Sequence, residues 1–145
     1  MRKLEDLLAD LQREAAMIPT NNQSALMLAG QMIENKVKDM IGTKQIFWQD
    51  LSQSTIDRKR RKGWGRGGDP ASPLWETGEY DRSIEYKLVG NNTVRVTSDL
   101  DYVQYLEEGT SKMPPRPVFK PAAKIVLKNF LGTNRLSQFY LRSLR

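Results

Sequence analysis

The side chains that could carry out catalysis in this sequence are carboxylates, lysines, tyrosines and serines, because cysteine and histidine are missing. The 145 residues include no cysteine and no histidine, which excludes disulfides, Cys/His zinc sites, thiol nucleophiles and mechanisms with a catalytic histidine. Asp99 and Asp101 precede Glu107 and Glu108, and acidic clusters of this kind can hold Mg²⁺ for phosphoryl transfer. A loop followed by a solvated helix end explains the same four residues, and we favour that interpretation. The sequence also contains no glycine-rich phosphate-binding motif, so we expect no enzymatic activity, no cofactor and no metal.

A second group of candidate functional side chains lies in a run of basic residues that is interrupted by glycines. Residues 57–68 carry six Lys/Arg against one Asp and include four glycines, a composition that disfavours a helix interior or a strand. We therefore predict a flexible basic loop over residues 57–72. Basic side chains combined with aromatic rings bind single-stranded nucleic acid without sequence preference. The residues of this segment that we expect to make contacts are Arg58, Lys59, Arg60, Arg61, Lys62, Trp64 and Arg66.

The net charge of +6 is unevenly distributed along the chain. Residues 69–108 carry three Lys/Arg against nine Asp/Glu, whereas residues 109–145 carry eight Lys/Arg and no acidic residue. Three interpretations remain open. The basic stretches are solvated faces, or acidic and basic patches meet between neighbouring copies in a head-to-tail contact that can close into a ring, or the basic loop contacts DNA.

The elements that position these residues begin and end with helices. Apolar side chains recur at helical spacing over residues 3–17 and again over residues 20–41, where Thr20 and Gln23 have capping-box spacing and Gly42 is a stop signal. Residues 1–42 are thus predicted to be a helical N-terminal part. A further helix is predicted over residues 120–130, and residues 124–145 are expected to form a helical C-terminal part.

The middle of the chain is predicted to contain a small sheet. Alternating apolar and polar residues on either side of Gly90-Asn91-Asn92 predict a β-hairpin of residues 84–89 and 93–98. Short helices are predicted over residues 53–59 and 102–108, and a short helix or a turn over residues 77–84. The proline-rich residues 113–117 are predicted to be extended. The expected fold is a single α+β domain, in which residues 73–123 form the sheet-containing core. No apolar run is long enough to span a membrane and the first residues lack a leader pattern, so we expect a soluble protein.

Three blocks of residues, in this order, resemble the tail-completion and head–tail joining (neck) proteins of tailed bacteriophages. The first block is Trp48-Gln49-Asp50-Leu51-Ser52, followed by Thr55-Ile56 and Lys59. The second block is Leu74, Thr77-Gly78 and Ser83-Ile84. The third block is Tyr102, Glu108-Gly109-Thr110, Met113-Pro114-Pro115-Arg116-Pro117 and Phe119. The similarity spans residues 47–123, and the chain departs from the family pattern at Tyr80, at Val103 and at residues 106–109.

The resemblance implies a structural virion protein that completes the upper tail end and helps join it to the DNA-filled head. It implies a homo-oligomeric ring, six-fold where it meets the tail tube, located in the neck of the virion and assembled in the host cytoplasm. The implied partners are other copies of the chain, neck and connector proteins, and tail-terminator or tail-tube proteins, with non-specific contact to genomic DNA in the channel and no membrane. The alternative is a small basic nucleic-acid-binding protein. The residues that match the family positions are Trp48, Leu51, Thr77, Gly78, Ser83, Tyr102, Gly109, Pro114 and Pro117.

Several matched residues have an expected structural role. Gly78 and Gly109 would permit turns that a Cβ atom would strain. Arg116, between two prolines, either pairs with the carboxylate of Glu107 or Glu108 or is an exposed charge. Trp48 and Trp75 are expected to be core or subunit-interface anchors. The basic loop is expected to become ordered when it contacts a neighbouring neck protein or DNA.

Overall fold

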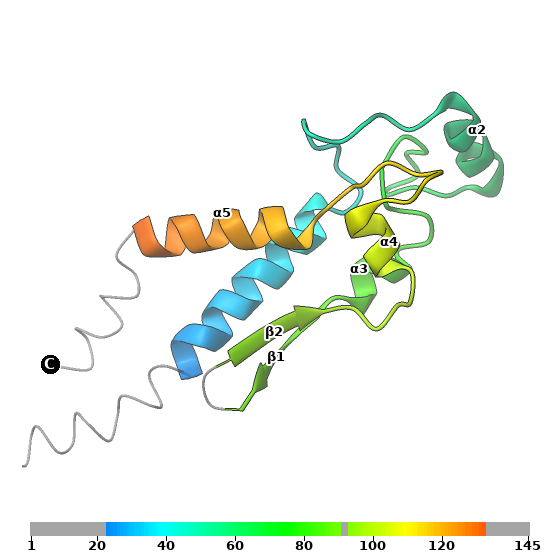
Figure 1. The fold of residues 1–145 in the computed structure, drawn as a ribbon. Helices are drawn as coiled ribbons and strands as arrows, with labels where there is room; N and C mark the ends of the chain where they lie inside the picture. The colour runs from blue at the N-terminus through cyan, green and yellow to red at the C-terminus, as the bar shows by residue number, and fades with distance from the viewer. Residues whose placement is uncertain (1–22, 91–92, 133–145) are drawn as a thin grey trace, which may run out of the picture.

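The computed structural model describes residues 23–90 and 93–132. Within these residues the fold is α+β, as predicted, with helices arranged around one two-stranded antiparallel sheet (Figure 1). The helices predicted over residues 3–17 and in the tail after residue 133, and the capping box at Thr20, lie outside the described residues.

The longest helix of the described chain covers residues 23–40. Its buried side chains include Ala25, Ala29, Val37 and Met40, and their helical spacing places them on one face. The helix stops at Gly42, which has a φ of 83° and whose N–H donates to the carbonyl oxygen of Pro73 at 2.8 Å. The predicted stop signal is therefore confirmed, and glycine is the residue type that adopts this backbone conformation without strain.

The predicted hairpin is also confirmed, with β1 at Glu85–Val89 and β2 at Thr93–Thr97. The half-buried residues of β1 pair with half-buried residues of β2, as in the register Tyr86↔Val96. The hairpin lies along the 23–40 helix (Figure 1), at a point where a Cβ atom on Gly30 would come within 2.5 Å of Val94 Cγ2. The Tyr86 N–H donates to Glu34 Oε2 at 3.0 Å and ties the edge of the sheet to the helix.

Helix α2, Gln53–Lys62, corrects the prediction of a loop beginning at residue 57, because residues 57–62 form its second half. Both ends of the helix are capped. The Ser52 side chain accepts from the Thr55 N–H at 3.3 Å, and Gly63 ends the helix in the left-handed conformation. Four basic residues occupy the last turn, where the helix dipole favours cations. These end effects outweigh the composition on which the loop prediction relied.

Three further helices surround the core: α3 at Glu79–Ser83, α4 at Val103–Glu108 and α5 at Phe119–Gly132. They agree with the predicted helices, except that α5 continues two residues past the predicted end at residue 130. Residues 114–118 between α4 and α5 are neither helix nor strand, as the prolines predicted. The side chains of the buried core are Val37, Met40, Ile41, Trp48, Tyr80, Ile84, Val118 and Ala122.

Candidate binding cavity

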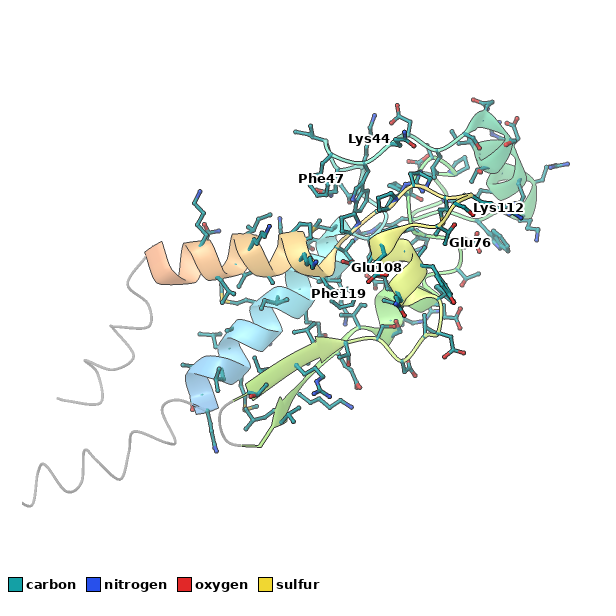
Figure 2. The ribbon with its side chains drawn as sticks, in the orientation of Figure 1. Lys44, Phe47, Glu76, Glu108, Lys112 and Phe119 are labelled. Carbon is teal, nitrogen blue, oxygen red and sulfur yellow. The ribbon has the colours of Figure 1, made fainter. Side chains whose placement is uncertain are left out.

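A cavity of about 610 Å³ lies where the three sequence blocks meet. Its walls come from residues 49–52 and the adjoining face of α2, from residues 74–80, and from α4 together with residues 112–116. Glu76 and Lys112, labelled in Figure 2, line it from two of these segments. Leu74, also in the wall, has a φ of 60°, a left-handed conformation that is uncommon for a residue other than glycine. The volume is within the usual range for small-molecule sites.

Arg116 lines this cavity and is buried, which corrects both expectations for it. Its side chain is neither exposed nor paired with Glu107 or Glu108; Nη2 donates to the carbonyl oxygens of Gln49 at 3.2 Å and Asp50 at 3.4 Å. The buried Nε has no hydrogen-bond partner within the described part of the chain, and burial lowers the pKa of the guanidinium. Arg116 therefore joins the third sequence block to the first and remains a charged group with unused donors.

Glu107 and Glu108 have separate roles. Glu107 Oε1 accepts from the N–H of Val118 and from the N–H of Phe119, the latter at 2.9 Å. It therefore satisfies the first backbone donors of α5, which have no partner inside that helix. Glu108 is exposed, and its carboxylate accepts only a long hydrogen bond of 3.5 Å from Gln104. Neither carboxylate lines the cavity.

Lys59 is also buried, whereas the sequence predicted an exposed contact residue. Its ammonium group donates to the carbonyl oxygen of Ser72, and the side chain lines the cavity. Burial lowers the pKa of Lys59, the nearby charges of Glu76 and Asp69 raise it, and Arg58 and Arg116 lower it. Lys59 thus holds the 63–72 loop onto α2 and brings a second buried cation close to Arg116.

The other predicted basic residues lie outside the cavity, apart from Arg58, which lines it and pairs with Glu76 at 3.4 Å. Arg60, Arg61 and Lys62 are exposed on the last turn of α2. The Lys62 ammonium lies 4.3 Å from the centre of the Trp64 ring, and Arg66 Nη1 donates to the carbonyl oxygen of Ile41 at 2.9 Å. Arg66 therefore stabilises the carboxyl end of the 23–40 helix.

The 63–72 loop is held by hydrogen bonds of its own. The Gly65 N–H donates to the carbonyl oxygen of Glu76 at 3.2 Å, and the Ser72 hydroxyl accepts from the Arg66 N–H at 2.8 Å. A Cβ atom on Gly65 would come within 2.0 Å of the Asp69 carbonyl oxygen, so this close turn depends on a glycine. The expectation that the loop becomes ordered only on docking is therefore not supported.

Two tyrosines contribute hydroxyl groups to the cavity wall. Tyr80 is 4% exposed, and its hydroxyl has no hydrogen-bond partner among the residues that the structure describes. Burial, and after it the charge of Glu107, raises the pKa of Tyr80, which keeps the hydroxyl protonated. The Tyr102 hydroxyl donates to Glu79 Oε2 at 3.3 Å, and burial followed by that carboxylate raises the pKa of Tyr102. In the sequence, Tyr80 stands out only as a departure from the family pattern, and this departure is the one sequence feature that pointed to its place in the cavity wall.

The remaining family positions have structural roles. Trp48 is a buried core residue whose indole N–H donates to the carbonyl oxygen of Pro117 at 3.2 Å. Gly78 and Gly109 have positive φ angles of 83° and 76°, as expected for turns that require glycine. The Ser83 hydroxyl donates to the carbonyl oxygen of Tyr80 at 2.7 Å. The positions that line the cavity are Leu51, Thr77, Tyr102 and Pro114.

Asp99 and Asp101, two of the four acidic residues that by sequence could hold Mg²⁺, are exposed between β2 and α4, and the other two belong to α4. The described residues include no group of three or more Asp or Glu side chains that could hold a metal ion. None of the helices within the described ranges is long and apolar enough to cross a membrane.

Comparisons with known proteins found no relative of this chain: no protein-family description, no curated protein and no solved structure matches it.

Proposed function

We propose that this protein is a structural component of a tailed-phage virion that forms a ring at the neck or upper tail end, completes the tail and helps join it to the head. The proposal rests on the resemblance of residues 47–123 to neck and tail-completion proteins. In the ring, copies of the chain contact one another and the adjoining neck, connector or tail-terminator proteins.

The observation that carries the proposal is the way in which the three resembling blocks interlock. The Trp48 indole in the first block donates to Pro117 in the third, and Arg116 donates to Gln49 and Asp50. Leu74 and Trp75, in and beside the second block, pack against the same core. The three blocks are therefore parts of one structural unit, and this supports the proposal because a shared fold would require it.

The surface of the domain supports an assembly role. Ile46 is 102% exposed and its neighbour Phe47, labelled in Figure 2, is 56% exposed. On α5, Ile125 and Leu127 are 42% and 43% exposed, while Val126 between them is buried. Apolar side chains exposed on two elements are typical of surfaces that other proteins cover. The exposed cations at the end of α2 supply charge that a neighbouring acidic face can pair with.

Electron microscopy of a lysate from a phage lacking this reading frame tests the proposal. We expect separate DNA-filled heads and tails, or tails with defective upper ends.

The variant Arg60→Gln/Arg61→Gln/Lys62→Gln keeps helix-forming residues on α2 and leaves the buried Lys59 intact, so it removes charge without disturbing the core. It is expected to reduce infectious particles at least tenfold. The matched control, Lys87→Gln/Arg95→Gln/Lys124→Gln, changes three exposed cations on other elements. Normal particles from the deletion phage would refute the proposal.

A second candidate function is non-specific nucleic-acid binding, which the basic last turn of α2 favours. Against it, the Trp64 ring already has Lys62 over one face, whereas binding of unpaired bases relies on an accessible ring. Binding of single-stranded DNA measured at about 0.05 and 0.2 M salt distinguishes the two functions, because contacts to several phosphates lose affinity steeply with salt.

A further inference from the structure

Two side chains of the cavity wall carry buried hydrogen-bond donors that no group among the described residues satisfies. Among the described residues, the buried side-chain polar atoms without a partner are Tyr80 Oη and Arg116 Nε, and both side chains line this one cavity. Buried polar groups in proteins are nearly always paired, and an unpaired group calls for a specific explanation such as a bound water or ion. Two such groups at the same cavity point to one shared ligand.

The charges in the cavity wall indicate the kind of ligand. Lys59 and Arg116 are 3% and 8% exposed, and both donate only to backbone carbonyl oxygens. Neither cation is within ion-pair distance of a carboxylate in the part of the chain that the structure describes. Since an isolated buried charge is costly, buried cations are normally balanced by an anion.

The charges of the wall favour an anionic ligand. Four Lys/Arg and three Asp/Glu side chains line the cavity. The acidic residues have other partners: Asp50 pairs with Lys44, outside the wall, at 2.5 Å, Glu76 pairs with Arg58, and Glu79 accepts from Tyr102. None of the three pairs with Lys59 or Arg116, so an anionic ligand would balance these two cations.

The size and the apolar wall of the cavity define the rest of the ligand. The volume of about 610 Å³ far exceeds the size of a carboxylate group, and Leu74, Trp75, Leu106 and Met113 contribute apolar surface. We propose that the cavity binds a carboxylate carried on an apolar body, with the carboxylate held by Lys59, Arg116 and the Tyr80 hydroxyl. This inference does not depend on the proposed virion function, because the groups that hold the carboxylate all belong to one copy of the chain.

The test uses 3-phenylpropionate as the probe, with 3-phenylpropionamide as its uncharged counterpart and inorganic phosphate as an anion without an apolar body. Binding is followed by NMR of the full chain through the indole N–H of Trp75, with Trp64, outside the cavity wall, as an internal reference. We expect a dissociation constant on the order of 1 mM for the acid, and binding of the amide and of phosphate at least tenfold weaker.

Tyr80→Phe is the decisive variant, because the hydroxyl makes no hydrogen bond within the described protein. It should weaken binding of the acid about tenfold without lowering the melting temperature of the free protein. Tyr105→Phe, an exposed tyrosine outside the cavity, should bind the acid normally. Equal binding of acid and amide, tighter binding of phosphate, or an unchanged affinity in Tyr80→Phe would overturn the proposal.

A sedimentation measurement then identifies the source of the carboxylate. If saturating 3-phenylpropionate dissociates oligomers of the chain, the natural ligand is an acidic side chain of a second copy. If the acid binds and oligomers persist, the natural ligand is a free carboxylic acid.

Discussion

Glu107 and Glu108 show how strongly a role depends on where a single side chain points. Both belong to α4, yet the Glu107 carboxylate satisfies two backbone N–H groups at the start of α5 and Glu108 faces solvent. Helix N-terminal donors that lose a side-chain acceptor must be satisfied in another way or remain unpaired. The stability of α5 therefore depends on a residue twelve positions before its first residue.

We predict that Glu107→Ala lowers the free energy of unfolding by about 1–3 kcal/mol, because two partly buried donors lose their acceptor. The matched control, Glu108→Ala, removes an exposed carboxylate from the same helix and is expected to change stability by less than about 0.5 kcal/mol. Urea denaturation followed by circular dichroism measures both variants. Equal losses in the two variants would mean that the contact with α5 contributes nothing.

Residue roles could be predicted from the sequence only in part. The pattern indicated that Arg116 and Trp48 matter, and both connect distant blocks of the chain. The partners of Arg116 could not be predicted, since they are backbone carbonyl groups 66 and 67 positions away. Every residue has a carbonyl group, so the sequence does not indicate which one accepts the hydrogen bond. The buried position of Lys59 was missed for the same reason, because its partner is the Ser72 carbonyl oxygen.

At the scale of elements, the spacing of apolar residues predicted the helices and strands correctly, whereas the amino-acid composition of residues 57–62 did not. The hairpin, the 23–40 helix and α5 were predicted from the spacing of apolar residues, which reflects the face that each element buries. The second half of α2 was predicted as loop because it contains many cations, although the Ser52 and Gly63 caps define its ends. How the elements pack on one another depends on contacts that no local pattern reports, such as that between Gly30 and the hairpin.

We predict that Gly30→Ala destabilises the fold by about 1–3 kcal/mol, although alanine is the better helix former by about 1 kcal/mol. The reason is the 2.5 Å approach between the added Cβ and Val94 Cγ2. Val94→Ala removes the opposing methyl groups, so the double variant Gly30→Ala/Val94→Ala should lose less stability than the sum of the single variants. Thermal denaturation of all four proteins measures this coupling, and a stabilised Gly30→Ala variant would show that the helix and hairpin are not in close contact.

At the scale of the whole molecule, the separation of charge suggests how copies would assemble. The exposed cations at the end of α2 and the exposed acids Asp99, Asp101 and Glu108 come from different elements of one domain. A contact between unlike surfaces is head-to-tail, and repetition of it closes a ring when the rotation is suitable. Ion pairs at such a contact weaken with salt, since the Debye length is about 10 Å at 0.1 M.

Two complementary variants test the head-to-tail contact within the proposed ring. The first, Asp99→Asn/Asp101→Asn/Glu108→Gln, lacks the acidic surface, and the second, Arg60→Gln/Arg61→Gln/Lys62→Gln, lacks the basic surface. Each variant alone keeps only one half of the contact, so each should sediment as a monomer under conditions in which the unmodified chain forms rings. In an equal mixture, the basic surface of the first variant can meet the acidic surface of the second, but each partner's remaining surface is disabled. We therefore expect heterodimers and no rings, whereas rings formed by either variant alone would show that these surfaces do not hold the copies together.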